Sequence, residues 1–131
     1  MVEQERAARL LDAVIAWADE HGVLGDPHVQ DRLGEARAGC ESARYLAYSV
    51  IDERARGVPP SAQAYVARVA MVRADKLVAE TAFEIMGQVS VDDDSLAGQN
   101  YFSALTAGVA AGSYKVNLDL IARQVLMLPR S

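Results

Sequence analysis

Apolar residues recur every three or four positions along most of the chain, and this spacing predicts α-helices. From near Glu3, the first apolar face consists of Ala7, Leu10, Leu11, Val14, Ile15 and Ala18. The acidic start of this segment and the His21-Gly22 pair after it suit the two ends of a helix. Asp26 and Pro27 predict the start of a second helix, because aspartate caps free amides and proline suits the first helical position.

The second and third predicted helices carry regular seams of mostly small apolar side chains, as in helical bundles. In the second helix, which should end near Arg56, the seam is Val29, Leu33, Ala36, Cys40, Ala43, Ala47 and Val50. In the third, over about 61–86, the seam is Ala64, Ala67, Met71, Ala74, Val78, Ala82 and Ile85. The segment 57–61 contains two prolines and predicts a short turn, so the two helices should be antiparallel.

Two shorter helices are expected after Gly87, which should end the third helix. One covers about 96–110, following an acidic loop at 91–95 whose residues can cap it. The last should run from about Tyr114 to Leu128-Pro129 and bury Val116, Leu120, Ile121, Val125 and Leu126. The sequence therefore predicts an all-α fold, an antiparallel up-down-up-down bundle with an extra C-terminal helix, in one domain of residues 1–131.

Composition agrees with one small helical domain and excludes several classes of function. The chain has 131 residues, of which 51% are hydrophobic and 24% charged, enough to form a single core. Its net charge of −5 argues against binding to nucleic-acid phosphates. The chain has no apolar stretch of the ~18–20 residues that span a bilayer, and its start does not resemble a secretory signal. We expect a cytoplasmic protein with no nucleic-acid and no membrane partner.

Residues suited to catalysis or metal binding are few and scattered. His21 and His28 lack metal-binding spacing, and the acidic run 92–94 lacks the alternation of a calcium loop. Cys40 falls in the second seam, where we expect a small buried side chain and no nucleophile. The expected packing residues among the aromatics are Trp17, Tyr45, Tyr48 and Tyr65. Taken alone, periodicity and composition indicate a helical domain with no catalytic residue and no metal ligand.

The C-terminal residues add a resemblance to a known family. Leu-Ile-Ala-Arg-Gln-Val-Leu-Met-Leu-Pro-Arg at 120–130 resembles Ile-Ile-Ala-x-x-Val-Leu-x-Leu-Pro-Arg, the ending of acyl-CoA dehydrogenases. Residues 26–35, 41–48 and 82–87 resemble earlier segments of the same C-terminal helical domain, the last of which normally ends in Leu-Gly-Gly. The resemblance implies a flavoprotein of fatty acid metabolism, in which FAD accepts a hydride from an acyl-CoA and a glutamate removes the α-proton. It also implies contacts between subunits, and two preceding domains, one helical and one of β-structure.

Some of the family's motif residues are replaced in this chain. The glutamate of the family's Tyr-Glu-Gly-Thr turn falls at Ala111, whose methyl group cannot accept a proton. The resemblance leaves four positions for contact with FAD, and these are Gly87, Gly112, Ser113 and Asn117. For the two glycines and the serine, an ordinary helix end or helix cap is the alternative interpretation.

Three hypotheses for function remain open. The first is the C-terminal domain of an acyl-CoA dehydrogenase-like FAD-dependent oxidoreductase, inactive alone, with the missing N-terminal and β-domains on another chain. The second is a non-catalytic scaffold that forms homo- or hetero-oligomers through the bundle and has lost FAD binding. The third is a small helical binding protein unrelated to flavin, which the match at 120–129 disfavours.

Overall fold

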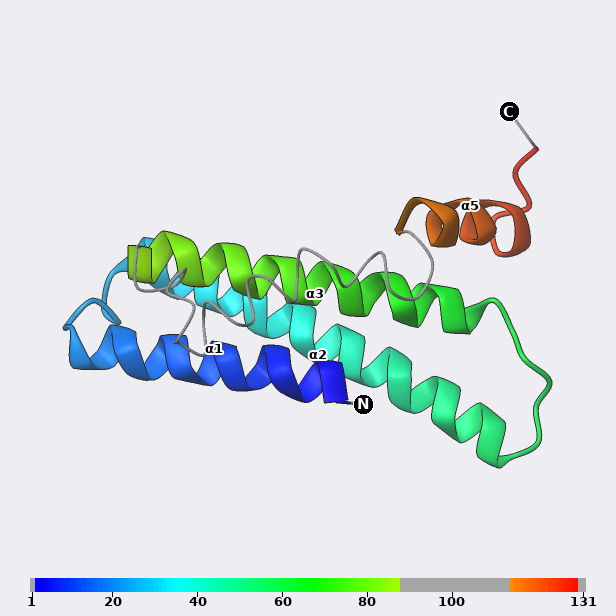
Figure 1. The fold of residues 1–131 in the computed structure, drawn as a ribbon, viewed down its shortest axis with the longest axis horizontal. Helices are drawn as coiled ribbons and strands as arrows, with labels where there is room; N and C mark the ends of the chain where they lie inside the picture. Colours follow the sequence, from blue (N-terminus) through cyan, green and yellow to red (C-terminus); the bar gives the residue numbers. More distant parts are fainter. Residues whose placement is uncertain (1, 88–113, 130–131) are drawn as a thin grey trace.

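A computed structural model describes residues 2–87 and 114–129 of the chain, and every regular element in these two segments is a helix. The helices are α1 (Val2–Glu20), α2 (Pro27–Ala55), α3 (Gln63–Met86) and α5 (Tyr114–Gln124). Successive helices α1, α2 and α3 run antiparallel and lie side by side, and α5 packs against α3 (Figure 1). The predicted all-α fold is confirmed, whereas the helix expected over 96–110 lies outside the described residues.

The apolar faces of α1, α2 and α3 meet in one core. The largest fully buried apolar side chains are Leu10, Leu11, Val14 and Val78. The predicted seam of α2 contributes Leu33, Ala36, Cys40 and Ala43. Small residues allow α2 and α3 to approach closely, since a Cβ atom added at Gly39 would lie only 3.3 Å from Cδ2 of Leu77. The facing of these three helices is therefore the one that the periodicity predicts.

The helix ends follow the local signals of the sequence. The Asp26 carboxylate accepts hydrogen bonds from the backbone N–H groups of His28 and Val29, at 2.8 and 3.2 Å. This contact caps α2 as expected. Gly87 ends α3 beside the start of α2 with a φ of +63°, a left-handed conformation that favours glycine.

The last helix is shorter and less buried than predicted. It ends at Gln124 instead of continuing to Leu128, because Met127 turns left-handed with a φ of +55° and the Leu128 N–H bonds back to the Ala122 carbonyl at 2.8 Å. The expected burial is wrong at three positions, since Val116, Val125 and Leu126 are exposed. Among the described helices α5 packs mainly against α3, so one flank of α5 is covered and the others face outward.

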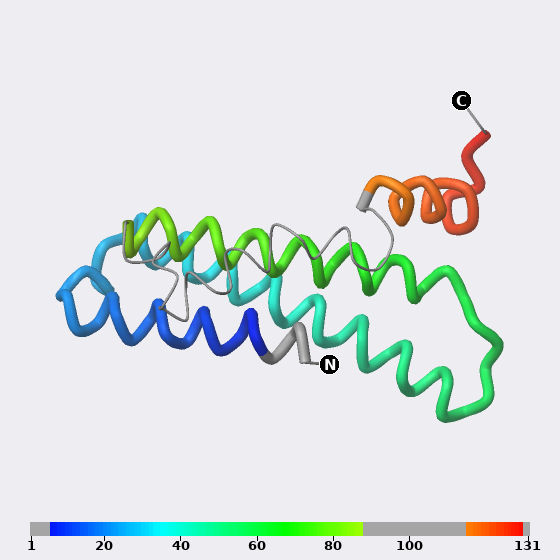
Figure 2. Tube along the Cα trace, in the orientation of Figure 1, coloured from blue at the N-terminus to red at the C-terminus, as the bar shows by residue number. Residues whose placement is uncertain are grey.

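The expectation that all four aromatics pack inside is also wrong. Tyr45 is 71% exposed and Tyr48 is 51% exposed. Figure 2 shows that the coloured part of α1 lies beside the N-terminal half of α2, so α2 continues well past α1. Trp17 does find a neighbour, because its ring stacks on that of His21 with centroids 3.9 Å apart.

Candidate cofactor-contact residues

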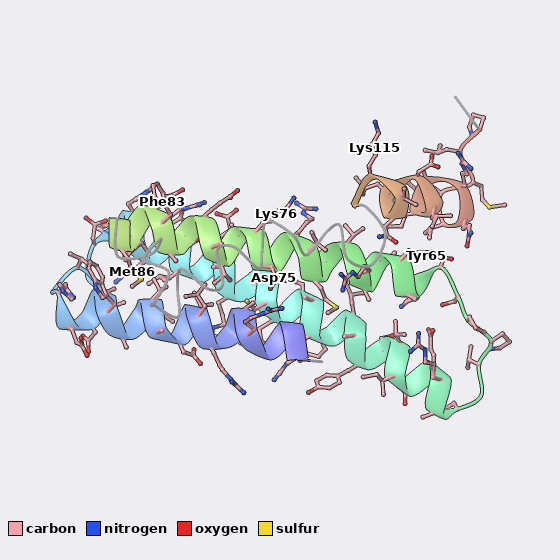
Figure 3. All side chains as sticks on the ribbon, viewed as in Figure 1. Tyr65, Asp75, Lys76, Phe83, Met86 and Lys115 are labelled. Atoms are coloured by element: carbon pink, nitrogen blue, oxygen red, sulfur yellow. The ribbon has the colours of Figure 1, made fainter. Side chains whose placement is uncertain are left out.

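The two described members of the predicted FAD set lie at opposite ends of α3. Gly87 directly follows Met86, the last residue of that helix, and Asn117 belongs to α5. In Figure 3, Lys115 of α5 lies near Tyr65 at the start of α3, and Met86 lies at the far end. A helix of 24 residues is about 36 Å long. The chain therefore does not bring Gly87 and Asn117 together, and Gly112 and Ser113 lie outside the described residues.

Gly87 presents an open stretch of backbone. An added Cβ atom would meet nothing within 4 Å, although the positive φ would strain any side chain placed there. The Gly87 N–H itself donates to the Phe83 carbonyl, which closes the last turn of α3. A ligand can therefore approach this backbone without steric hindrance, and this fits the role that the family resemblance implies.

A cluster of charged side chains lies beside Gly87, at the corner of the bundle where the end of α3 meets the start of α2. Arg32, near the start of α2, donates to both carboxylate oxygens of Glu84 at 2.7 and 2.9 Å and to Glu35 at 2.9 Å. The hydrogen bond to Glu84 is the main cause of a raised pKa of the Arg32 guanidinium. Bidentate pairs of this kind are geometrically specific. The pair thus holds the end of α3 against the start of α2, next to Gly87.

Asn117 is placed differently, because its residue is only 7% exposed. A polar side chain with so little exposed surface offers little to a ligand. The neighbouring Lys115 is exposed and extends away from the helices in Figure 3. Contact between Asn117 and a cofactor stays a prediction, and such contact requires α5 to present this residue to another surface.

An open groove of about 510 Å³ runs between α2 and α3. Its walls carry two carboxylates, Glu35 and Glu80, and two cations, Arg73 and Lys76. The remaining lining residues are Gly39, Ser42, Ala70, Ala74 and Leu77. None of these charged residues was expected from the sequence to form a site. Their spacing could have indicated the groove, because positions 35, 39 and 42 share one face of α2 and positions 73, 77 and 80 share one face of α3.

Cys40 is buried, as its place in the seam predicts. Burial raises the pKa of its thiol to about 11, and Arg37 opposes this only in part. A thiol that stays protonated at neutral pH is a poor nucleophile. Across residues 2–87 and 114–129, His, Cys, Asp and Glu side chains form no group of three or more able to hold a metal ion. In the same two segments, no helix has the length and apolar character needed to cross a membrane.

Among the described residues, three long antiparallel helices and a shorter one against α3 define an all-α bundle. Residues 1–126 match the family described as acyl-CoA dehydrogenase, C-terminal domain. This match spans nearly the whole chain and includes all the helices described above. The chain therefore belongs to the acyl-CoA dehydrogenase family and corresponds to its C-terminal domain.

Solved structures of related proteins show the same fold. The Tcur3481-Tcur3483 steroid ACAD is 26% identical with a TM-score of 0.85, and the match covers 98% of this chain and 35% of that chain. A variant of the same complex gives 27% identity and a TM-score of 0.84, with 98% and 36% covered. The ChsE4-ChsE5 complex from Mycobacterium tuberculosis shares the fold at 19% identity and a TM-score of 0.84, again covering 98% and 36%.

The chain thus spans little more than a third of the length of these structural relatives. Two of these structures are of the Tcur3481-Tcur3483 steroid ACAD, and the third is of the ChsE4-ChsE5 complex. A comparison with curated protein sequences gave no match.

Proposed function

We propose that this chain supplies the C-terminal helical domain of a flavin-dependent acyl-CoA dehydrogenase and is inactive alone. In the proposed assembly, another chain carries the N-terminal and β-domains, and residues 1–131 act as one domain. The family match over residues 1–126 is the observation that carries the proposal. We further propose that the assembly resides in the cytoplasm and dehydrogenates an acyl-CoA thioester at its α and β carbons.

Two features of the described residues support a need for a second chain. Gly87 and Asn117 lie at opposite ends of α3, so these two residues cannot surround one flavin within a single copy of this chain. Exposed apolar side chains are concentrated in α5 and the residues after it, including Leu118, Leu126 and Met127. Apolar patches of this kind are typical of surfaces that another protein covers.

When FAD is bound, it supplies the hydride acceptor of the reaction. In this chain, the proposed part of Gly87 is to let the cofactor approach the backbone closely, at the corner that the Arg32–Glu84 pair fixes. Gly112, Ser113 and Asn117 are proposed contacts on the α5 side. The proton-accepting carboxylate would come from the other chain, because Ala111 occupies the position of the family's turn glutamate.

Co-expression with the chain encoded beside it tests this proposal. We expect the purified assembly to show flavin absorption and to oxidise an acyl-CoA with an artificial electron acceptor, while the isolated chain shows neither. Because two of the related structures are of a steroid ACAD, a steroid acyl-CoA is the first substrate to try. A stable assembly without flavin would contradict the proposal and favour the second candidate, a non-catalytic scaffold subunit.

Replacement of the open glycine provides a matched pair of variants. Gly87→Val places a branched side chain over the backbone and should lower the flavin content of the assembly. Gly57→Val places the same side chain at another left-handed glycine, with a φ of +73° instead of +63°, in the turn that follows α2. The two changes impose similar backbone strain, so a loss of flavin specific to Gly87→Val separates cofactor contact from a folding defect.

A further inference from the structure

Arg32 joins the start of α2 to the last turn of α3 through a two-point contact. Its Nε and Nη2 atoms donate to the two carboxylate oxygens of Glu84, at 2.7 and 2.9 Å. Its Nη1 atom donates at 2.9 Å to Glu35, which lies three residues further along α2 and so anchors the guanidinium to its own helix. This fork of two hydrogen bonds fixes the direction of the Glu84 carboxylate as well as its distance.

His28 and two apolar side chains also approach this turn of α3. The Nε2 atom of His28 lies 4.0 Å from Oε2 of Glu84, which is beyond hydrogen-bond distance. Ile85 and Met86 pack against the hydrophobic core. Apolar contacts are non-directional, so they restrict how far α3 lies from the core more than they restrict the rotation of its last turn. Arg32 thus adds a directional restraint that the apolar contacts lack.

The backbone of Gly87 turns with the segment that carries Glu84. Gly87 follows Glu84 by three residues, which is less than one turn of helix. Its N–H donates to the Phe83 carbonyl, and this bond ties Gly87 to the same last turn. A rotation of that turn about the helix axis therefore changes the direction in which the open backbone of Gly87 points.

The segment from which Arg32 extends is itself held in place. The Asp26 carboxylate caps the first turn of α2 through two backbone N–H groups. The Gln30 side chain donates to the Leu24 carbonyl at 3.1 Å, which ties the same turn to the loop before it. Arg32 lies two residues after Gln30, so its fork starts from a fixed position.

We propose that Arg32 is a positioning residue for the flavin contact at Gly87, because its fork on Glu84 sets the orientation in which α3 presents the glycine backbone. The proposal rests on the flavin role of Gly87 given above. Arg32 acts only through Glu84 and makes no contact with the cofactor. Without the fork, the last turn of α3 adopts other rotations as well, and the cofactor must select the competent one, which lowers its affinity.

Two variants remove the fork while they roughly preserve the length of the side chain. Arg32→Lys retains the positive charge but offers a single ammonium group, and Glu84→Gln leaves one acceptor oxygen instead of two. In the co-expressed assembly, each should raise the dissociation constant of FAD by roughly tenfold, the effect of one lost hydrogen bond between charged groups. Titration of the flavin-free assembly with FAD, followed by flavin fluorescence, measures this constant.

The same two substitutions at other positions are the controls. Arg37→Lys alters a contact of 2.6 Å with Asp12 that joins α2 to α1, and Glu80→Gln alters an exposed carboxylate one turn before Glu84. Both controls should leave the dissociation constant of FAD unchanged, and the melting temperatures of all four variants should agree within about 3 °C. An unchanged FAD affinity in Arg32→Lys and Glu84→Gln, or an equal loss in the controls, would overturn the inference.

A measurement without cofactor tests the same orientation. In ¹H–¹⁵N correlation spectra of the purified chain, the amide signal of Gly87 should shift in Arg32→Lys and stay in place in Arg37→Lys. A Gly87 signal that does not move in Arg32→Lys would contradict the positioning role.

Flavin binding by the unmodified assembly separates this inference from the proposed function. If the unmodified assembly binds FAD, and Gly87→Val weakens that binding while Arg32→Lys does not, only the positioning role of Arg32 fails. If the unmodified assembly binds no FAD, the proposed function fails and the positioning role fails with it.

Discussion

Thr81 is a fully buried polar side chain in α3. Its hydroxyl oxygen finds no hydrogen-bond partner among the described residues. A buried hydroxyl without a partner is unfavourable, whereas an apolar group of the same shape avoids that cost. We therefore expect Thr81→Val to leave the free energy of unfolding unchanged or to raise it by up to about 1 kcal/mol. Urea unfolding measures this.

The converse substitution is the control. Val78 is also fully buried in α3, one turn away, and Val78→Thr introduces a hydroxyl into an apolar site. This variant should lose about 1–3 kcal/mol of stability. If Thr81→Val proved equally destabilising, the Thr81 hydroxyl would have a partner in the folded chain.

Ala43 tests the facing of α2. It is buried in the seam of α2, and an aspartate there would place an unpaired charge in the core. We expect Ala43→Asp to reduce stability by about 3–5 kcal/mol and to prevent cooperative folding. Ala38→Asp, on the exposed side of the same helix, should change stability by less than about 0.5 kcal/mol. Thermal unfolding followed by circular dichroism distinguishes the two.

Because of Cys40, the stability of the folded chain should depend on pH in the alkaline range. The folded state raises the pKa of the thiol from 9.0 to about 11, so the unfolded state loses this proton first. The contribution of Cys40 to stability is therefore complete below about pH 9 and is lost as the pH rises toward 11. Chemical denaturation at several alkaline pH values should show this decline, and Cys40→Ala should weaken it. A flat profile in the native chain would contradict the raised pKa.

The ion pair between Arg32 of α2 and Glu84 of α3 is partly buried, so it should contribute more to stability than an exposed surface pair. Arg32 is 19% exposed in its side chain and pairs with Glu84 through two hydrogen bonds. A double-mutant cycle with Arg32→Ala and Glu84→Ala should give a coupling free energy of about 1 kcal/mol. The exposed pair Arg123–Asp119 in α5 is the control and should give less than about 0.5 kcal/mol. Equal couplings would show that Arg32 is as weakly held as a surface residue.

Helices α1, α2 and α3 differ from α5 in how well local patterns describe them. The predicted seam positions of the first three are buried or half-buried, because each of these helices packs against at least two others. In α5 the same kind of spacing is present, but Val116 and Leu126 are exposed. Spacing predicts which side chains share a face, and the number of neighbouring helices decides how many faces are buried.

The molecule as a whole determines whether the candidate site can be complete. The family's turn glutamate is replaced at Ala111, a position outside the described residues. We expect Ala111→Glu to give no acyl-CoA oxidation in the isolated chain with added FAD, because one carboxylate does not supply the domains that bind a flavin. Oxidation of an acyl-CoA by this variant alone, measured with an artificial electron acceptor, would contradict the proposed need for a second chain. The unmodified chain is the control.

The residues of the candidate site were predicted from the family resemblance and not from the local pattern, and this prediction was the least complete one. Gly87 was identified through the family resemblance, and the structure adds that its backbone is open to approach. Asn117 was identified in the same way, yet it is buried and lies at the other end of α3. A motif lists residues in order along the chain and contains no information about the distance between them in space.

Apolar periodicity, together with the cap residues and the proline-containing turn at 57–61, was sufficient to predict the all-α fold, the antiparallel α2–α3 hairpin and the ends of the first helices. These features depend on interactions between residues within a turn or two of each other, such as the Asp26 cap. The exposure of Tyr48, the outward faces of α5 and the separation of Gly87 from Asn117 emerge only from the folded chain. They depend on how far each helix extends beside its neighbours, which is set by packing between residues distant in sequence.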